Sequence, residues 1–385
     1  MRTRTELGQA LDQARRTTDA LFQLIRPDAL CDRPVPERHR LVFYLGHLEA
    51  FDWNLIARHA LDVRAFHPTF DRLFAFGIDP PPGQLPDDTP ASWPGLDEIE
   101  HYNSRTREII DDLVDRVPEQ LLHVAIEHRL MHAETFAYLL HQLPYAKKLG
   151  TVDQPRATCP PPRHEFVQIP AGDALLGLER DREFGWDNEF ERHSVRVPAF
   201  SIGRYKVTNR DYLSFVAQGG SVPFFWSRNG ETWMYRGMFD EYPLPLDNPV
   251  YVTQEQASAY AAHCGMRLPT EAEFHRAALH ATPSCNVDFR EWDPIPVTAD
   301  DGDRAALAQL IGNGWEWTST AFEPFPGFEP FPFYANYSEP FFDGNHFVLK
   351  GGSPRTAACF LRPTFRNWFR PAYPYVYGTF RMVQS

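Results

Sequence analysis

A proline-rich segment near the middle of the chain separates two stretches of different character. Residues 151–164 read TVDQPRATCPPPRH, and we take 151–165 as a linker between a domain at 1–150 and a domain at 166–385. Before the linker, apolar residues recur at helical spacing, whereas after it short periodic stretches alternate with loops dense in Gly, Pro and aromatic residues. A chain of 385 residues has room for two such domains. The sequence therefore predicts an α+β protein, with a helical bundle followed by a domain of short strands.

The first domain is predicted to contain four helices, each with an apolar stripe. The first carries Leu7, Leu11, Leu21 and Leu24 at helical spacing, and the others are expected at 36–63, 96–116 and 118–141. Four such helices favour a four-helix bundle. A long proline-rich loop at 66–93 is expected between the second and third helices. In the second domain we expect one helix at 254–264 and another that begins at a capping box formed by Thr270 and Glu273.

The charge and hydropathy of the chain exclude several classes of partner. The net charge is −13 without any run of Lys or Arg, which disfavours nucleic acid and anionic membranes as partners. The N-terminal residues lack the apolar core of a signal peptide, and no apolar run reaches the roughly 18 residues that a membrane span needs. Five scattered cysteines without a CxxC motif suit reduced thiols. We therefore expect a cytoplasmic protein that binds neither nucleic acid nor membranes. We take it to be a monomer, although nothing in the sequence bears on its oligomeric state.

Two histidines in the fourth predicted helix are candidate metal ligands. Residues 127–134 read EHRLMHAE, so His128 and His132 lie four apart on one face of the helix. The chain has 15 histidines, so chance alone is expected to give roughly 0.6 such pairs, and the spacing by itself carries little information. His47, in the sequence YLGHLEAF of the second helix, is a natural third ligand, because an antiparallel neighbouring helix could face the pair. Three imidazoles with open positions suit a catalytic metal. The alternative is that His47 is a polar core residue bonded to backbone or to a carboxylate.

An ordered series of motifs in the second half resembles a known family. FVQIPAGDALLG (166–177), GMRLPTEAEFHRAA (265–278), IGNGWEWTST (311–320), VLKGGSPRT (348–356) and GTFRMV (378–383) are similar to the formylglycine-generating-enzyme or sulfatase-modifying fold, which is a C-type-lectin-like domain. In the first half, HLEAF at 47–51 and HxxxHxE at 128–134 resemble a DinB-like four-helix bundle. A bundle followed by this domain resembles the non-heme iron sulfoxide synthases of ergothioneine and ovothiol biosynthesis, and selenoneine synthases share the arrangement. The C-terminus has no cysteine pair, so formylglycine-generating activity is not expected.

This resemblance implies a cofactor, a co-substrate and a set of site residues. In the family, Fe(II) is held by three histidines of the bundle, which correspond to His47, His128 and His132, and O2 is the co-substrate. The segment YANYSEPFF (334–342) matches the active-site lid of the family. Residues of the second domain implied in the site are Tyr334 as proton donor, Tyr337 as a second active-site tyrosine, and Asn367 and Trp368 as lining of the pocket for hercynine. The family places its active site between the two domains. Without the resemblance, the tyrosine loop would be read as a cover over the core.

The chain departs from the thiol-using members of the family at three places. After Arg72 no basic residue follows until Arg105, although those enzymes carry arginines there that bind the carboxylates of the donor. Phe369 stands where an Asp commonly binds the donor's ammonium group, and Met131 stands where a Gln commonly precedes the last histidine ligand. A zwitterionic donor would therefore lose its charged partners, each worth roughly 1.5–3 kcal/mol, whereas a neutral donor would lose none.

These departures lead to a hypothesis about the reaction. We expect Fe(II)- and O2-dependent formation of a C–Se bond between the imidazole C2 of hercynine and a 1-seleno-sugar, with Phe369 and Met131 among the substrate-binding residues. The alternative is a C–S bond-forming sulfoxide synthase that uses γ-glutamylcysteine or cysteine, with a basic residue placed elsewhere, for example Arg366 or Arg370. A further alternative is a metal-free, lectin-like binding protein without catalytic activity.

Overall fold

A computed structural model describes residues 3–76, 84–151, 158–180, 182–281, 285–299 and 307–384. Its contacts divide the chain into two compact units, Met1–Thr151 and Val152–Ser385, and each is described by itself. Residues 152–157 of the predicted linker lie outside the described residues. Within the part of the chain that the structure describes, no helix combines the length and the apolar composition required to cross a membrane.

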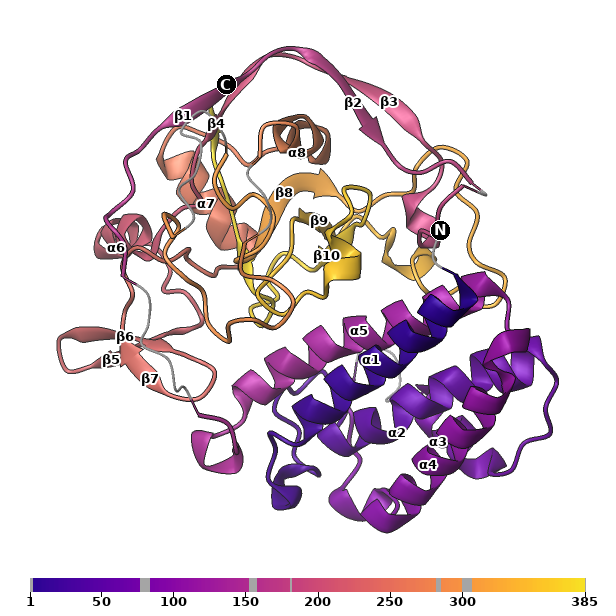
Figure 1. The fold of residues 1–385 in the computed structure, drawn as a ribbon. Coiled ribbons are helices and arrows are strands. Elements are labelled where there is room, and N and C mark those ends of the chain that lie inside the picture. The colour runs from indigo at the N-terminus through magenta and orange to yellow at the C-terminus, as the bar shows by residue number, and fades with distance from the viewer. Residues whose placement is uncertain are drawn as a thin grey trace. The chain divides into compact units, whose positions relative to one another are not determined.

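The first unit is a helical bundle, as the sequence predicts (Figure 1). Its helices are α1 (Arg4–Phe22), α2 (Leu41–Asp52), α3 (Pro68–Phe76), α4 (Leu96–Leu113) and α5 (Glu119–Gln142). Helix α1 packs along α5, and α2 contacts α3, α4 and α5. The Thr3 hydroxyl accepts from the Glu6 N–H while the Glu6 carboxylate accepts from the Thr3 N–H, a capping box that begins α1. Because α2 touches three other helices, its side chains lie at the centre of the bundle.

The region around α2 differs from the prediction in two ways. The helix expected at 36–63 begins only at Leu41, and after Asp52 it continues as a π-helical segment, Trp53–Ala60. The residues before Leu41 are held by Arg40, whose guanidinium donates to the Cys31 carbonyl at 2.6 Å and to the Asp88 carboxylate at 2.8 Å.

The loop predicted at 66–93 contains helix α3, and its residues 77–83 lie outside the described residues. Pro68 suits the first turn of α3, and the buried rings of Phe70 and Phe74, four residues apart, form the apolar face of the helix. The prolines on either side of this helix hid it from the sequence pattern.

In its described residues the second unit has short strands and three α-helices, and the protein is therefore of the α+β class. The helices are α6 (Asn209–Ala217), α7 (Gln254–His263) and α8 (Glu271–Ala278). The strands are β1 (Phe166–Ile169), β2 (Gly172–Leu176), β3 (His193–Val197), β4 (Phe200–Gly203), β5 (Trp226–Asn229), β6 (Thr232–Arg236), β7 (Glu241–Pro243), β8 (Trp315–Ala321), β9 (Phe347–Lys350), β10 (Asn367–Phe369), β11 (Gly378–Thr379) and β12 (Val383–Gln384). The predicted capping box is confirmed, since the Thr270 hydroxyl accepts from the Glu273 N–H at 3.1 Å.

Within the described ranges, the strands form four small sheets. Their orders are β1–β4–β12, β10–β9–β8–β11, β2–β3 and β5–β6–β7. In the four-stranded sheet β8 and β9 are antiparallel, with Trp317 opposite Leu349, whereas β11 runs parallel to β8. Helix α8 packs against β2, β3, β8 and β9 (Figure 1). Its residue Phe274 is buried in a core with Leu176 and Ile202. Strand β9 contacts α8, and β10, the strand that carries Trp368, pairs with β9.

Candidate metal centre and aromatic cluster

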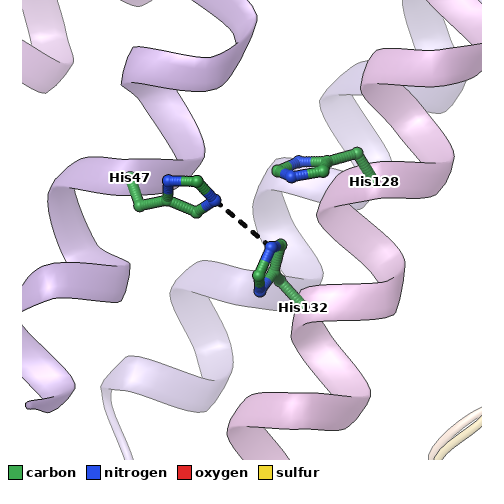
Figure 2. Close-up of side chains that lie close together, drawn as sticks. All are labelled: His47, His128 and His132. Carbon is green, nitrogen blue, oxygen red and sulfur yellow. Dashed lines mark hydrogen bonds between the residues drawn. The ribbon is translucent and has the colours of Figure 1, made fainter. Parts of the chain in front are cut away.

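Three histidines converge inside the first unit (Figure 2). His47 comes from α2, and His128 and His132 come from successive turns of α5. One ring nitrogen from each lies within 4.8 Å of the others, and the Nε2 atoms of His47 and His132 are 3.2 Å apart. The structure therefore brings together the three residues that the sequence singled out, although their role as ligands stays a prediction.

A buried ion cluster sets the register of the two helices that carry these histidines. The Arg129 guanidinium donates to Glu49 at 2.9 Å, to Asp52 at 2.7 Å and to the Leu48 carbonyl at 3.1 Å. Arg129, Glu49 and Asp52 have no exposed surface. Arg129 follows His128 directly on α5, and Glu49 lies two residues after His47 on α2. The cluster therefore holds α2 and α5 at the level where the three imidazoles meet.

The imidazoles are neutral in the folded protein. Burial lowers the pKa of His47 to about 4, and burial together with the neighbouring imidazoles lowers the pKa of His128 and His132 well below the usual value. The neutral ring is the form that binds a metal. The Nδ1–H of His47 donates to the Phe74 carbonyl at 2.6 Å, which leaves the Nε2 lone pair directed at the other two histidines.

Aromatic side chains around the three histidines hold the imidazole rings in place. The His128 ring stacks on Phe51 with centroids 3.4 Å apart, and the His47 ring stacks on Phe43 at 4.7 Å. A set of three neutral imidazoles with oriented rings fits a catalytic divalent metal such as Fe(II), because three protein ligands leave positions open for substrates. Met131 lies half-buried on α5, one residue before His132.

An aromatic cluster in the second unit contains most of the other predicted site residues. The ring centroids of Tyr334 and Tyr337 are 5.5 Å apart, and those of Tyr337 and Trp368 are 5.3 Å apart. Trp368 stacks on Phe322 at 4.2 Å. Burial, with a smaller effect of the Asp187 charge, raises the pKa of Tyr334 to about 12, so its phenol keeps its proton at neutral pH.

The remaining predicted residues flank this cluster. The Asn367 side-chain oxygen accepts from the Trp368 N–H at 2.9 Å, and the Phe369 ring stacks on Tyr373 with centroids 5.1 Å apart. Arg366, considered above as a substitute for the missing basic residues, is buried and bound to the Glu271 carboxylate at 3.1 Å. Arg366 is therefore engaged in the core of the second unit.

Two sets of residues in these regions were not found from the sequence. One is the buried cluster of Arg129, Glu49 and Asp52. The other is the turn of residues 186–189, which has the sequence WDNE and contacts Tyr337 through the Trp186 ring. For the first set, the sequence signal was that Arg129 directly follows His128 and that Glu49 lies two residues after His47. The second set offered no signal of its own.

Comparisons with known proteins agree with this two-part architecture. Residues 10–142 match the DinB superfamily, and residues 152–287 and 286–385 match the family described as sulfatase-modifying factor enzyme 1-like domain. A protein of Mycolicibacterium thermoresistibile named hercynine oxygenase is 30% identical, over 99% of this chain and 95% of its own length. Hercynine oxygenase of Mycolicibacterium smegmatis is 33% identical over 71% of this chain and 74% of its own length. Ergothioneine biosynthesis protein 1 of Schizosaccharomyces pombe is 27% identical, and the chain spans 54% of that protein.

Proposed function

Because this chain belongs to the family of the hercynine oxygenases, we propose that it is an iron- and O2-dependent oxidoreductase that joins a chalcogen to C2 of the hercynine imidazole. The observation that carries the proposal is the convergence of three neutral imidazoles in a chain that aligns with a hercynine oxygenase over 99% of its length. In the overall reaction, the C2 hydrogen, the hydrogen on the chalcogen and one oxygen atom leave as water. The second oxygen atom stays on the chalcogen.

Each part of the proposed site has a physical task. His47, His128 and His132 would hold Fe(II), which supplies the one-electron and O2 chemistry that organic side chains lack. The Phe74 carbonyl keeps His47 in the tautomer whose Nε2 can bind a metal. Arg129 holds α2 and α5 in the register that brings the three imidazoles together. Tyr334 retains its proton at neutral pH and would deliver it from Oη to the reduced oxygen. Tyr337 and Trp368 present aromatic faces, which bind a trimethylammonium group well.

We propose a neutral 1-seleno-sugar as the chalcogen donor, with selenoneine as the eventual product. Two features of the second unit support this choice. Phe369 offers an aromatic ring stacked on Tyr373, where thiol-using relatives commonly have a carboxylate, and Arg366 is neutralised by Glu271. A thiol donor, γ-glutamylcysteine or cysteine, is the second candidate, because the relatives reported above are named for hercynine oxygenation and ergothioneine biosynthesis.

Donor competition tests this proposal. Protein loaded with Fe(II) is supplied with hercynine and O2 and with one donor at a time, and O2 uptake and product mass are followed. We expect the fastest turnover with the seleno-sugar. Faster turnover with γ-glutamylcysteine or cysteine would overturn the selenium assignment and leave hercynine oxygenation in place. Hercynine binding without O2 uptake for any donor would favour the lectin-like binding protein. His128→Ala serves as the control, since it removes one ligand and is expected to abolish O2 uptake.

A further inference from the structure

The WDNE turn of the second unit lies against the tyrosine segment, which we define as residues 331–338. Its four residues, Trp186, Asp187, Asn188 and Glu189, are each at most 1% exposed. The turn is closed on itself, because the Trp186 N–H donates to the Glu189 carboxylate at 2.9 Å and the Glu189 N–H donates to the Trp186 carbonyl at 2.8 Å. The backbone of the turn and the Glu189 side chain are therefore held in one conformation.

Asp187 binds both ends of the tyrosine segment. Its carboxylate accepts a hydrogen bond from the Ser338 hydroxyl and another from the backbone N–H of Phe331. Between these two contacts, the Tyr334 N–H donates to the Phe331 carbonyl at 3.0 Å and the Tyr337 N–H donates to the Tyr334 carbonyl at 3.1 Å. One carboxylate therefore closes a pair of consecutive turns that carry both tyrosines.

The neighbours of Asp187 complete this contact. The Trp186 ring stacks on Tyr337 with centroids 4.1 Å apart, and the Asn188 side chain donates to the Ser338 hydroxyl at 2.9 Å. Ser338 is thus bound from two sides, which fixes the end of the segment.

The same turn also holds the chain that leads to Trp368. Glu189 accepts from Arg362 Nε at 2.9 Å and from the Thr364 hydroxyl at 2.7 Å. The Asn188 carbonyl accepts from Arg366 at 3.3 Å. The WDNE turn therefore sets the tyrosine segment and the β10 strand relative to each other within the second unit.

We propose that Asp187 is a positioning residue for Tyr334, which holds the tyrosine segment in the conformation that proton transfer requires. This inference rests on the proposed role of Tyr334. Stability alone does not explain a carboxylate at this place. Burial without a cationic partner among the described residues costs free energy, and it raises the pKa of Asp187 to about 6. Such costs occur most often at functional sites. The Asp187 charge also acts on the phenol of Tyr334 and favours its protonated form.

A double-mutant cycle tests the inference, with Asp187→Asn, Tyr334→Phe and the double variant compared in the full chain loaded with Fe(II). We expect Asp187→Asn to lower kcat about tenfold or more while the KM for hercynine stays within about twofold. In the Tyr334→Phe background the same change should have no further effect on kcat, because Asp187 acts through Tyr334. Additive losses in the double variant would overturn the inference. Unchanged kcat in Tyr334→Phe would instead refute the proposed role of the tyrosine.

Ser338 offers a matched pair of variants in case Asp187→Asn fails to fold. Ser338→Thr keeps the hydroxyl that donates to Asp187, whereas Ser338→Ala removes it. We expect kcat to fall in Ser338→Ala and to recover in Ser338→Thr. Hydrogen exchange gives a readout without turnover: the amides of the tyrosine segment should exchange at least about tenfold faster in Ser338→Ala, while those of β1 and β4 stay unchanged. Equal exchange and equal kcat in the two Ser338 variants would contradict the proposal.

Discussion

Removal of Arg129 is the perturbation whose effect follows most directly from the first unit. Arg129→Met keeps a long helix-forming side chain and deletes the charge. Two carboxylates without exposed surface, Glu49 and Asp52, would then lose their shared partner. In this variant Glu49 would still accept a hydrogen bond from Arg107 at 2.7 Å, whereas Arg107 does not donate to Asp52. Removal of one member of a buried ion cluster costs about 3–5 kcal/mol, because the remaining charge is left uncompensated.

A loss of this size is measurable in the intact chain. For a unit of this length it corresponds to a fall in Tm of roughly 6–20 °C. Urea denaturation can be monitored through the hydrogen exchange of the α2 and α5 amides. These amides report on the unfolding of the bundle and not on that of the second unit. We also expect weaker Fe(II) binding, because α2 and α5 would no longer be held at the level where His47 and His128 meet.

Two control variants separate this mechanism from a general sensitivity of the bundle to mutation. Arg105→Met deletes an exposed arginine that is paired with Glu108 at 3.0 Å, and it should cost no more than about 0.5 kcal/mol. The triple variant Glu49→Met/Asp52→Leu/Arg129→Met removes every charge of the cluster and should be at least about 2 kcal/mol more stable than Arg129→Met alone. A triple variant less stable than the single one would refute the argument from uncompensated charge.

Three further predictions concern the ligand region and the WDNE turn. Gly46→Ala would place a Cβ 2.6 Å from the Phe74 ring, so it should cost about 1–3 kcal/mol by denaturation and weaken Fe(II) binding, whereas Gly8→Ala, whose Cβ would lie 3.9 Å from its nearest contact, should not destabilise. The folded-state pKa of Asp187, about 6, exceeds the unfolded value of 3.8, so its stabilising contribution is complete below about pH 4 and is lost as the pH rises through 6. Relative to Asp187→Asn, the wild type should therefore lose up to about 3 kcal/mol of unfolding free energy across this window; a parallel pH profile for the two proteins would contradict the assignment. Fe(II) at 100 times its Kd should stabilise the bundle by about 2.7 kcal/mol, an increment that chelation and His132→Ala should both remove.

Local sequence rules predicted much of the first unit. His128 and His132 share a face of α5 because the helical repeat depends only on neighbouring residues. The capping box at Thr270 was likewise visible, since its partner Glu273 lies three residues away. His47 could be proposed only because a neighbouring antiparallel helix could face the pair, and the resemblance to a known family then strengthened that choice. Spacing carries no information about it, because His47 lies 81 positions before His128.

Other parts depend on contacts that no local pattern contains. Helix α3 was read as loop, because prolines on both sides outweighed the spacing of Phe70 and Phe74. The Ser338 hydroxyl reaches Asp187 across 151 residues of sequence, and Arg129 on α5 reaches Asp52 on α2 across 77 residues. Charged residues in such places resemble ordinary surface residues until the fold shows that they are buried.

The hydrogen bond from His47 to the Phe74 carbonyl has a thermodynamic consequence. Phe74 belongs to helix α3, which ends two residues later. The sequence after this helix contains no arginine before Arg105, which is one of the departures that suggested a neutral donor. Any compound that stabilises α3 in this position also stabilises the ligand tautomer of His47. By reciprocity, occupancy of the imidazole site must favour the same position of α3 by an equal free energy. Metal affinity and the stability of α3 in this position are therefore two measurements of one coupling, and each can be read from the other.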